Sequence, residues 1–180
     1  TSDYHPVVKD LPHPVFGYFG AVDERLDWEI IRQLAESTDG SVVLAGPVLQ
    51  SPPELPANVH LPGGLPYCDL PQFLAGLDVA LIPFLDSPLV SYISPTKTPE
   101  YLAGGKPVVS TPIPDVISDY GDVVKVAPAG PNFIEQALAA AENPPASLDL
   151  ASEAAKRAMT WDEIANQMHK LVMEKIARLE

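Results

Sequence analysis

Short apolar runs alternate along this chain with segments whose apolar residues recur at helical spacing. The first run, at 15–19, stops at Gly20, and the apolar residues that follow it fall on one face of a helix over 26–35. Strands that alternate with helices pair in parallel through right-handed crossovers, so helices cover both faces of the sheet. The sequence therefore predicts an α/β fold with a doubly wound, mostly parallel sheet of about six strands. The predicted strands are 15–19, 41–46, 58–61, 78–83, a segment that begins at Val108, and 122–126.

A single domain is expected to account for most of the chain. Residues 1–14 hold three prolines and two histidines without periodicity, and we interpret them as a linker. Residues 15–180 are long enough for one domain with one core. The last helix is predicted to begin with a capping box at 160–163, and its apolar residues form a stripe along one face. The stripe consists of Trp161, Ile164, Met168, Leu171, Val172 and Leu179.

The stretch 94–111 reads as a loop, a short helix, a glycine stop at 104–105 and a buried strand. Thr98 suits the N-cap, Pro99 suits the first helical position, and Glu100 falls in the first turn. A helix entrance offers free N–H groups and a partial positive charge that favour a phosphate, and Lys97 would add a full charge. Glu100 is suited to accept hydrogen bonds from ribose hydroxyls. The stretch therefore predicts half of a nucleotide site.

The loops that follow the first and fourth strands are the second source of candidate residues. In doubly wound sheets, ligands bind outside the carboxyl ends of the strands, so these two loops are expected to meet at one crevice. They hold Gly20, Arg25, Asp86 and Tyr92. The stretch 94–111 is expected to open onto the same edge of the sheet.

The charge balance excludes some classes of partner. Asp and Glu number 24 against 11 Lys and Arg, which gives a formal charge of −13 and argues against nucleic acid or an anionic membrane as a partner. No apolar run approaches the roughly 20 residues of a membrane-spanning helix. Cys68 is the only cysteine, and the N-terminus does not resemble a signal peptide. A cytoplasmic location is therefore expected.

The segments 78–83 and 94–111 resemble the C-terminal domain of GT-B glycosyltransferases of the group-1, nucleotide-sugar type. The segments 17–20 and 58–63 also fit the order of that family, and the resemblance covers residues 15–180. It implies a Rossmann-like domain that binds a nucleotide-diphosphate sugar. The helix that begins at Thr160 resembles the family's C-terminal helix, which packs across the seam between the domains, so its apolar stripe is expected to be partly exposed in this chain and to support a dimer. The resemblance also implies that the N-terminal, acceptor-binding domain is absent from this chain, so that the chain by itself is not expected to complete the transfer.

The resemblance assigns roles to residues in and next to the stretch 94–111. Glu100 corresponds to the glutamate that accepts hydrogen bonds from the donor ribose. Lys97 and the backbone of Ile93 and Ser94 are candidates for the diphosphate, where they would stabilise the leaving nucleotide. Tyr67 follows the third strand, where relatives line the base pocket, and its ring is suited to stack on the base.

The loops that follow the first and fourth strands match the family less closely. Gly20 and Arg25 are expected to reach the same phosphates, although relatives carry an arginine and a lysine in this loop. Many relatives also place a glutamate that faces the sugar eight residues before Glu100, and here that position is Tyr92. Asp86 is the acid that is available to replace it in the same loop. The catalytic group therefore remains unassigned.

Two alternatives to a transferase stay open from the sequence. One is a nucleotide-sugar epimerase of the same fold, which would need acid and base groups at the sugar. The other is a non-catalytic interaction module, which Tyr92 in place of the glutamate favours. The sequence also leaves open the base, the sugar, the acceptor and the stereochemical outcome.

Other chemistries find little support. Gly17 and Gly20 do not form the dinucleotide fingerprint, which argues against a dehydrogenase. Ser110 and Thr111 lack the sharp nucleophile turn of hydrolases. The four histidines are scattered singly, without acids or cysteine at ligand spacing, so neither a metal nor a cofactor is expected.

Overall fold

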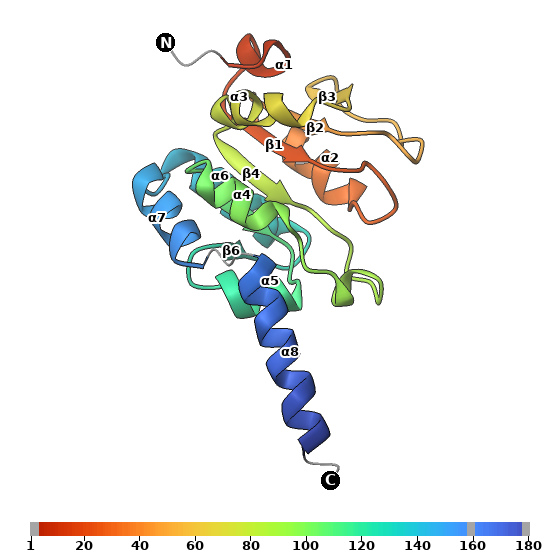
Figure 1. Ribbon diagram of the computed structural model, residues 1–180. Helices are drawn as coiled ribbons and strands as arrows, with labels where there is room; N and C mark the ends of the chain where they lie inside the picture. Colours follow the sequence, from red (N-terminus) through yellow and green to blue (C-terminus); the bar gives the residue numbers. More distant parts are fainter. Residues whose placement is uncertain (1–3, 158–160, 178–180) are drawn as a thin grey trace.

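A six-stranded parallel sheet forms the centre of the molecule (Figure 1). The computed structural model describes residues 4–157 and 161–177. Neighbouring strands follow the order β3-β2-β1-β4-β5-β6, and each pair is parallel. The predicted fold class is therefore confirmed. The strands are β1 Val15–Phe19, β2 Ser41–Ala45, β3 Val59–Gly63, β4 Val79–Ile82, β5 Val108–Ser110 and β6 Lys125–Val126.

Helices cover the sheet and extend beyond it. The α-helices are α1 Pro6–Lys9, α2 Trp28–Glu36, α3 Leu70–Ala75, α4 Lys97–Ala103, α5 Pro114–Tyr120, α6 Pro131–Glu142, α7 Ser147–Arg157 and α8 Trp161–Ala177. Two short 3₁₀ helices are η1 Tyr67–Asp69 and η2 Val90–Tyr92. Helix α2 packs beside α6, and α4 packs beside α7. No helix in the described ranges is long and apolar enough to cross a membrane.

The central strands are buried on both faces. Every residue of β1, β2 and β4 is buried, as expected for parallel strands that helices cover on both sides. The largest wholly buried side chains include Tyr18, Tyr101, Phe16 and Phe73. This core extends to residues before the sheet, because Val8 of α1 is only 1% exposed and the His5 N–H donates to Gln72 O at 3.2 Å. The described part of the segment that we interpreted as a linker thus packs on the domain.

Several element boundaries differ from the predictions by one or more residues, and two of the differences have a clear local cause. Helix α2 begins at Trp28 and not at residue 26, because the Asp27 carboxylate accepts hydrogen bonds from the N–H groups of Glu29 and Ile30 and so caps the helix. The last strand is shorter than 122–126. The N–H groups of Val123 and Val124 donate to Tyr120 O and hold the chain in a turn until β6 begins at Lys125.

Helix α8 extends away from the body of the domain (Figure 1). Its exposed apolar side chains include most of the described members of the predicted stripe. Some predicted features lie outside the described residues: Thr160 of the capping box, Leu179 of the stripe and the side chain of Trp161. The exposed side chains are Met168, Leu171, Val172, Met173 and Ile176.

The sheet order places the topological switch between β1 and β4. The chain leaves β1 toward β2 and leaves β4 toward β5, in opposite directions. The loops that follow these strands meet, as predicted: the Asp27 N–H donates to Pro83 O at 2.8 Å, and the Leu85 N–H donates to Arg25 O at 2.8 Å. The candidate residues of the two loops therefore share one edge of the sheet.

Gly46, directly after β2, lies against the loop after β1. A Cβ atom at Gly46 would lie 1.8 Å from Gly20 O, which no side-chain adjustment relieves because the neighbour is backbone. The Gly46→Ala variant is therefore expected to lose about 1–3 kcal/mol of unfolding free energy. Denaturant unfolding followed by circular dichroism measures this loss.

Gly64→Ala is the matched control for that experiment. A Cβ atom at Gly64 would lie 3.9 Å from its nearest neighbour, Pro47 N, which is an ordinary contact. Equal stability losses in the two variants would contradict the close approach at Gly46.

Candidate functional site

Helix α4 carries Lys97 and Glu100, the two charged candidates of the stretch 94–111. It begins at Lys97, so the prediction that Thr98 is its N-cap is wrong. The Thr98 N–H already donates to Pro95 O at 3.2 Å inside the first turn, and its side chain is wholly buried with no hydrogen-bond partner for the hydroxyl in the described part of the chain. The predicted glycine stop is confirmed, because Gly105 has a φ of +67°.

A buried tyrosine fixes α4 against the end of β1. Tyr101 is wholly buried, and its hydroxyl oxygen accepts a hydrogen bond of 3.0 Å from the Phe19 N–H. The two rings also pack edge to face, with centroids 4.9 Å apart. This contact places Lys97 and Glu100, which both precede Tyr101 on the same helix, beside the carboxyl end of the sheet.

Lys97 lies over two aromatic rings at this edge. Its Nζ is 5.1 Å from the centroid of Tyr18 and 5.2 Å from that of Phe84. Burial disfavours the charged ammonium and, with a smaller contribution from the Arg25 charge, lowers the pKa of Lys97 to about 8. Gly20 is its neighbour, since a Cβ at that glycine would lie 3.1 Å from Lys97 Cε. The structure thus brings Lys97 and Gly20 together, as expected.

Arg25 reaches the same region but is already paired. Its Nε donates to Asp23 Oδ1 at 2.8 Å and its Nη2 donates to Asp23 Oδ2 at 2.5 Å. This hydrogen bonding lowers the pKa of Asp23 and raises that of Arg25. The guanidinium carbon lies 5.6 Å from the Phe84 centroid. Two cations, Arg25 and Lys97, therefore lie over the Phe84 ring, and Asp23 pairs with one of them.

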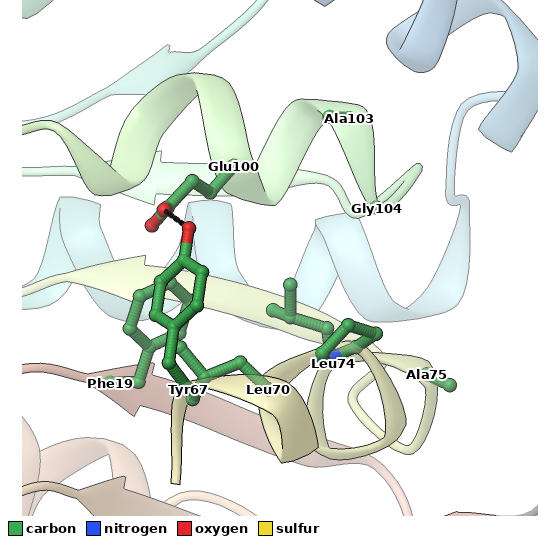
Figure 2. Close-up of a pocket in the computed structure, with 9 residues that line it drawn as sticks. Phe19, Tyr67, Leu70, Leu74, Ala75, Glu100, Ala103 and Gly104 are labelled. Atoms are coloured by element: carbon green, nitrogen blue, oxygen red, sulfur yellow. Dashed lines mark hydrogen bonds between the residues drawn. The ribbon is translucent and has the colours of Figure 1, made fainter.

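Glu100 faces a groove between α3 and α4 (Figure 2). The groove has a volume of about 380 Å³, and apart from Glu100 and Tyr67 its lining is apolar. Tyr67 comes from η1 and donates a hydrogen bond of 2.8 Å from its hydroxyl to Glu100 Oε1. This bond raises the pKa of Tyr67. The apolar lining includes Phe19, Leu70, Leu74, Ala75 and Ala103.

The structure does not bring the remaining candidates to this groove. Tyr92 is 92% exposed, and Asp86 is exposed in the loop after β4. Neither of them forms a hydrogen bond or ion pair with Lys97 or Glu100 within the described ranges. Ser94 lines a separate hollow beside α5, and Ile93 is half-buried. The roles of these four residues stay predictions.

Sequence reasoning missed several residues of this edge. Asp23 was not identified as the ion-pair partner of Arg25. The packing of the Lys97 ammonium over the rings of Tyr18 and Phe84 was not predicted either. Phe84 directly follows segment 78–83, which carries part of the family resemblance. That position was the one feature of the sequence that could have indicated a role for Phe84 at this edge. Among the residues that the structure describes, no three His, Cys, Asp or Glu side chains gather into a group that would hold a metal.

Comparisons with known proteins give the class of this domain. No protein-family model matches the chain. The chain is 31% identical over 108 residues to a putative teichuronic acid biosynthesis glycosyltransferase, TuaH, of Bacillus subtilis (strain 168), and the match covers 56% of this chain and 27% of the relative.

Solved structures match nearly the whole chain. A sucrose-phosphate synthase from Thermosynechococcus elongatus matches 94% of it with a TM-score of 0.69 and 18% identity, and the match covers 46% of that protein. HepE from Anabaena, solved in complex with UDP and glucose, matches 89% of it with a TM-score of 0.66 and 16% identity, and the match covers 48% of that protein. The chain thus spans about half the length of these solved relatives.

These findings define the class of the domain. The chain is an α/β domain with the GT-B glycosyltransferase fold. The resemblance seen in the sequence is confirmed by these matches, and the fold of the chain is that of about half of each solved protein.

The position of Lys97 predicts a pH dependence of stability. Its pKa falls from 10.5 to about 8 on folding, so between these values the unfolded chain holds more of this proton than the folded one. Unfolding free energy contributed by this group therefore rises with pH through that window. The Lys97→Met variant is expected to lack this rise, which urea unfolding at about pH 7.5 and about pH 10 measures.

Lys125→Met is the control, because Lys125 is exposed on β6. It is expected to keep the pH dependence of the wild type. An unchanged pH dependence in Lys97→Met as well would contradict the desolvation of Lys97.

Proposed function

We propose that this chain binds the nucleotide-diphosphate sugar of a glycosyltransferase, and that an acceptor-binding domain outside the chain completes the transfer. One observation carries the proposal. A single short helix, α4, presents Glu100 to a ring-sized apolar groove and presents Lys97, one turn earlier, to the loop at Gly20. This spacing suits a ligand with an apolar ring, a hydroxylated sugar and a charged diphosphate in that order.

Glu100 is proposed to hold the ribose. An ionised carboxylate only accepts hydrogen bonds, and the two ribose hydroxyls both donate them. The adjoining groove supplies an apolar surface for the base, with Phe19 and Leu70 in its lining. Tyr67 reaches Glu100 from the loop after β3, which supports its proposed role at the base.

Lys97 is proposed to hold the diphosphate together with Gly20. Its ammonium has lost part of its hydration over Tyr18 and Phe84, so an anion meets it at a smaller desolvation cost. Gly20 has no side chain to block a close approach of the phosphates. Arg25 and the backbones of Ile93 and Ser94 complete the proposed set. These groups would stabilise the charge that develops on the leaving nucleoside diphosphate.

UDP is the proposed leaving group, because the similar protein HepE was solved with UDP. Tyr92 and Asp86 are proposed for the sugar side, since both lie in the loop after β4 that adjoins the crevice. A cytoplasmic location and a dimer through the exposed apolar face of α8 remain part of the proposal. The acceptor is proposed to bind outside this chain.

Calorimetric titration with UDP, GDP and UDP-glucose tests the proposed site. We expect UDP to bind, and we expect Glu100→Ala to weaken it by about tenfold or more, because a hydrogen bond to a charged group is lost. Glu135→Ala is the matched control, since Glu135 is exposed on α6, outside the proposed site. Equal binding by Glu100→Ala and Glu135→Ala would overturn the ribose assignment.

The diphosphate assignment has a separate test. Lys97→Met is expected to weaken UDP binding by about tenfold while leaving uridine binding unchanged, because uridine carries no phosphate. UDP affinity of the wild type is also expected to fall as the pH rises past about 8, where Lys97 loses its proton. A loss of uridine affinity equal to that of UDP would show that Lys97 acts on the fold instead.

A further inference from the structure

The hydrogen bond between Tyr67 and Glu100 occupies a group that the proposed function needs. Glu100 Oε1 accepts the Tyr67 hydroxyl at 2.8 Å. In Figure 2, Tyr67 reaches from η1 across the end of the groove to Glu100 on α4. In this state, the groove is bridged at the end where the carboxylate lies.

A phenol and a ribose compete for the same acceptor. Both groups offer O–H donors, and a ribose that presents two adjacent hydroxyls to one carboxylate uses both of its oxygens. Each carboxylate oxygen can accept two hydrogen bonds, so the competition is for position: the Tyr67 hydroxyl, 2.8 Å from Oε1, takes one of the places from which a ribose hydroxyl would donate to that oxygen.

Little else holds Tyr67 in place. Its side chain is 76% exposed, and the hydrogen bond to Glu100 is its one polar side-chain contact within the described residues. It lies on a three-residue 3₁₀ helix none of whose residues is buried, and its neighbours Pro66 and Cys68 are exposed. Movement of Tyr67 away from Glu100 therefore breaks one exposed hydrogen bond and uncovers little apolar surface.

We propose that Tyr67 is a latch on the nucleotide site: in the free chain its hydroxyl occupies Glu100, and a nucleoside diphosphate displaces it before the ribose binds. This inference rests on the proposed function. Once displaced, the ring remains beside the groove and is free to pack on the base. The latch lowers the apparent affinity for the nucleotide by the fraction of molecules in which it is closed.

Removal of the hydroxyl alone tests the latch. Tyr67→Phe keeps the ring and abolishes the bond to Glu100, so UDP is expected to bind about threefold to tenfold more tightly than to the wild-type 180-residue chain. Tyr4→Phe, which removes a hydroxyl from a tyrosine in the N-terminal segment, is the matched control and is expected to leave UDP affinity unchanged. Calorimetry measures all three proteins under the same conditions.

A second measurement needs no nucleotide. The bond to Glu100 raises the pKa of Tyr67, so Glu100→Gln is expected to lower the pH at which the Tyr67 ring signal titrates in NMR spectra. A Tyr67 titration that does not respond to Glu100→Gln would overturn the latch directly.

The outcomes separate the latch from the donor site. Equal or weaker UDP binding by Tyr67→Phe, with UDP bound by the wild type, overturns the latch and leaves the donor site standing. An absence of UDP binding in the wild type and in Tyr67→Phe overturns the donor site, and the displacement step with it. Tighter binding by Tyr67→Phe alone supports both.

Discussion

A buried hydrogen bond joins the end of the first strand to the helix that carries the candidate site. The Phe19 N–H at the end of β1 donates to the hydroxyl of Tyr101, which is wholly enclosed in the core. An unpaired N–H and hydroxyl at this depth would each be costly, so the pair sets both the position and the rotation of α4. Lys97 and Glu100 take their places from this contact, one toward the loop at Gly20 and the other toward the groove.

The site combines two environments on one short helix. Lys97 lies over aromatic rings where water is partly excluded, so its charge is costly alone and favourable beside an anion. Glu100 lies at a more open, apolar groove and is satisfied by the Tyr67 hydroxyl. In a chain with a formal charge of −13, the overall field repels an anion, so the proposed anionic ligand would depend on such a local arrangement.

The sequence supported most of the fold, and the failures have local causes. Buried parallel strands produce continuous apolar runs, so β1, β2 and β4 were predicted nearly to the residue. The start of α4 was predicted wrongly because Thr98 is a good capping residue by type, while its backbone already bonds to Pro95 and its side chain is buried. Capping preference is a local property, and tertiary packing overrode it here.

The sequence by itself determined the alternation of strands and helices, and hence the edge where Gly20, Lys97 and Glu100 gather, since the carboxyl ends of parallel strands share one edge. Only the tertiary structure decided which groups pair there. Asp23 forms an ion pair with Arg25, and Tyr67 donates a hydrogen bond to Glu100. The ammonium of Lys97 lies over the rings of Tyr18 and Phe84. Most of these contacts join side chains from separate loops and strands. Their distances depend on how the elements pack, and no periodicity or spacing in the chain encodes that packing.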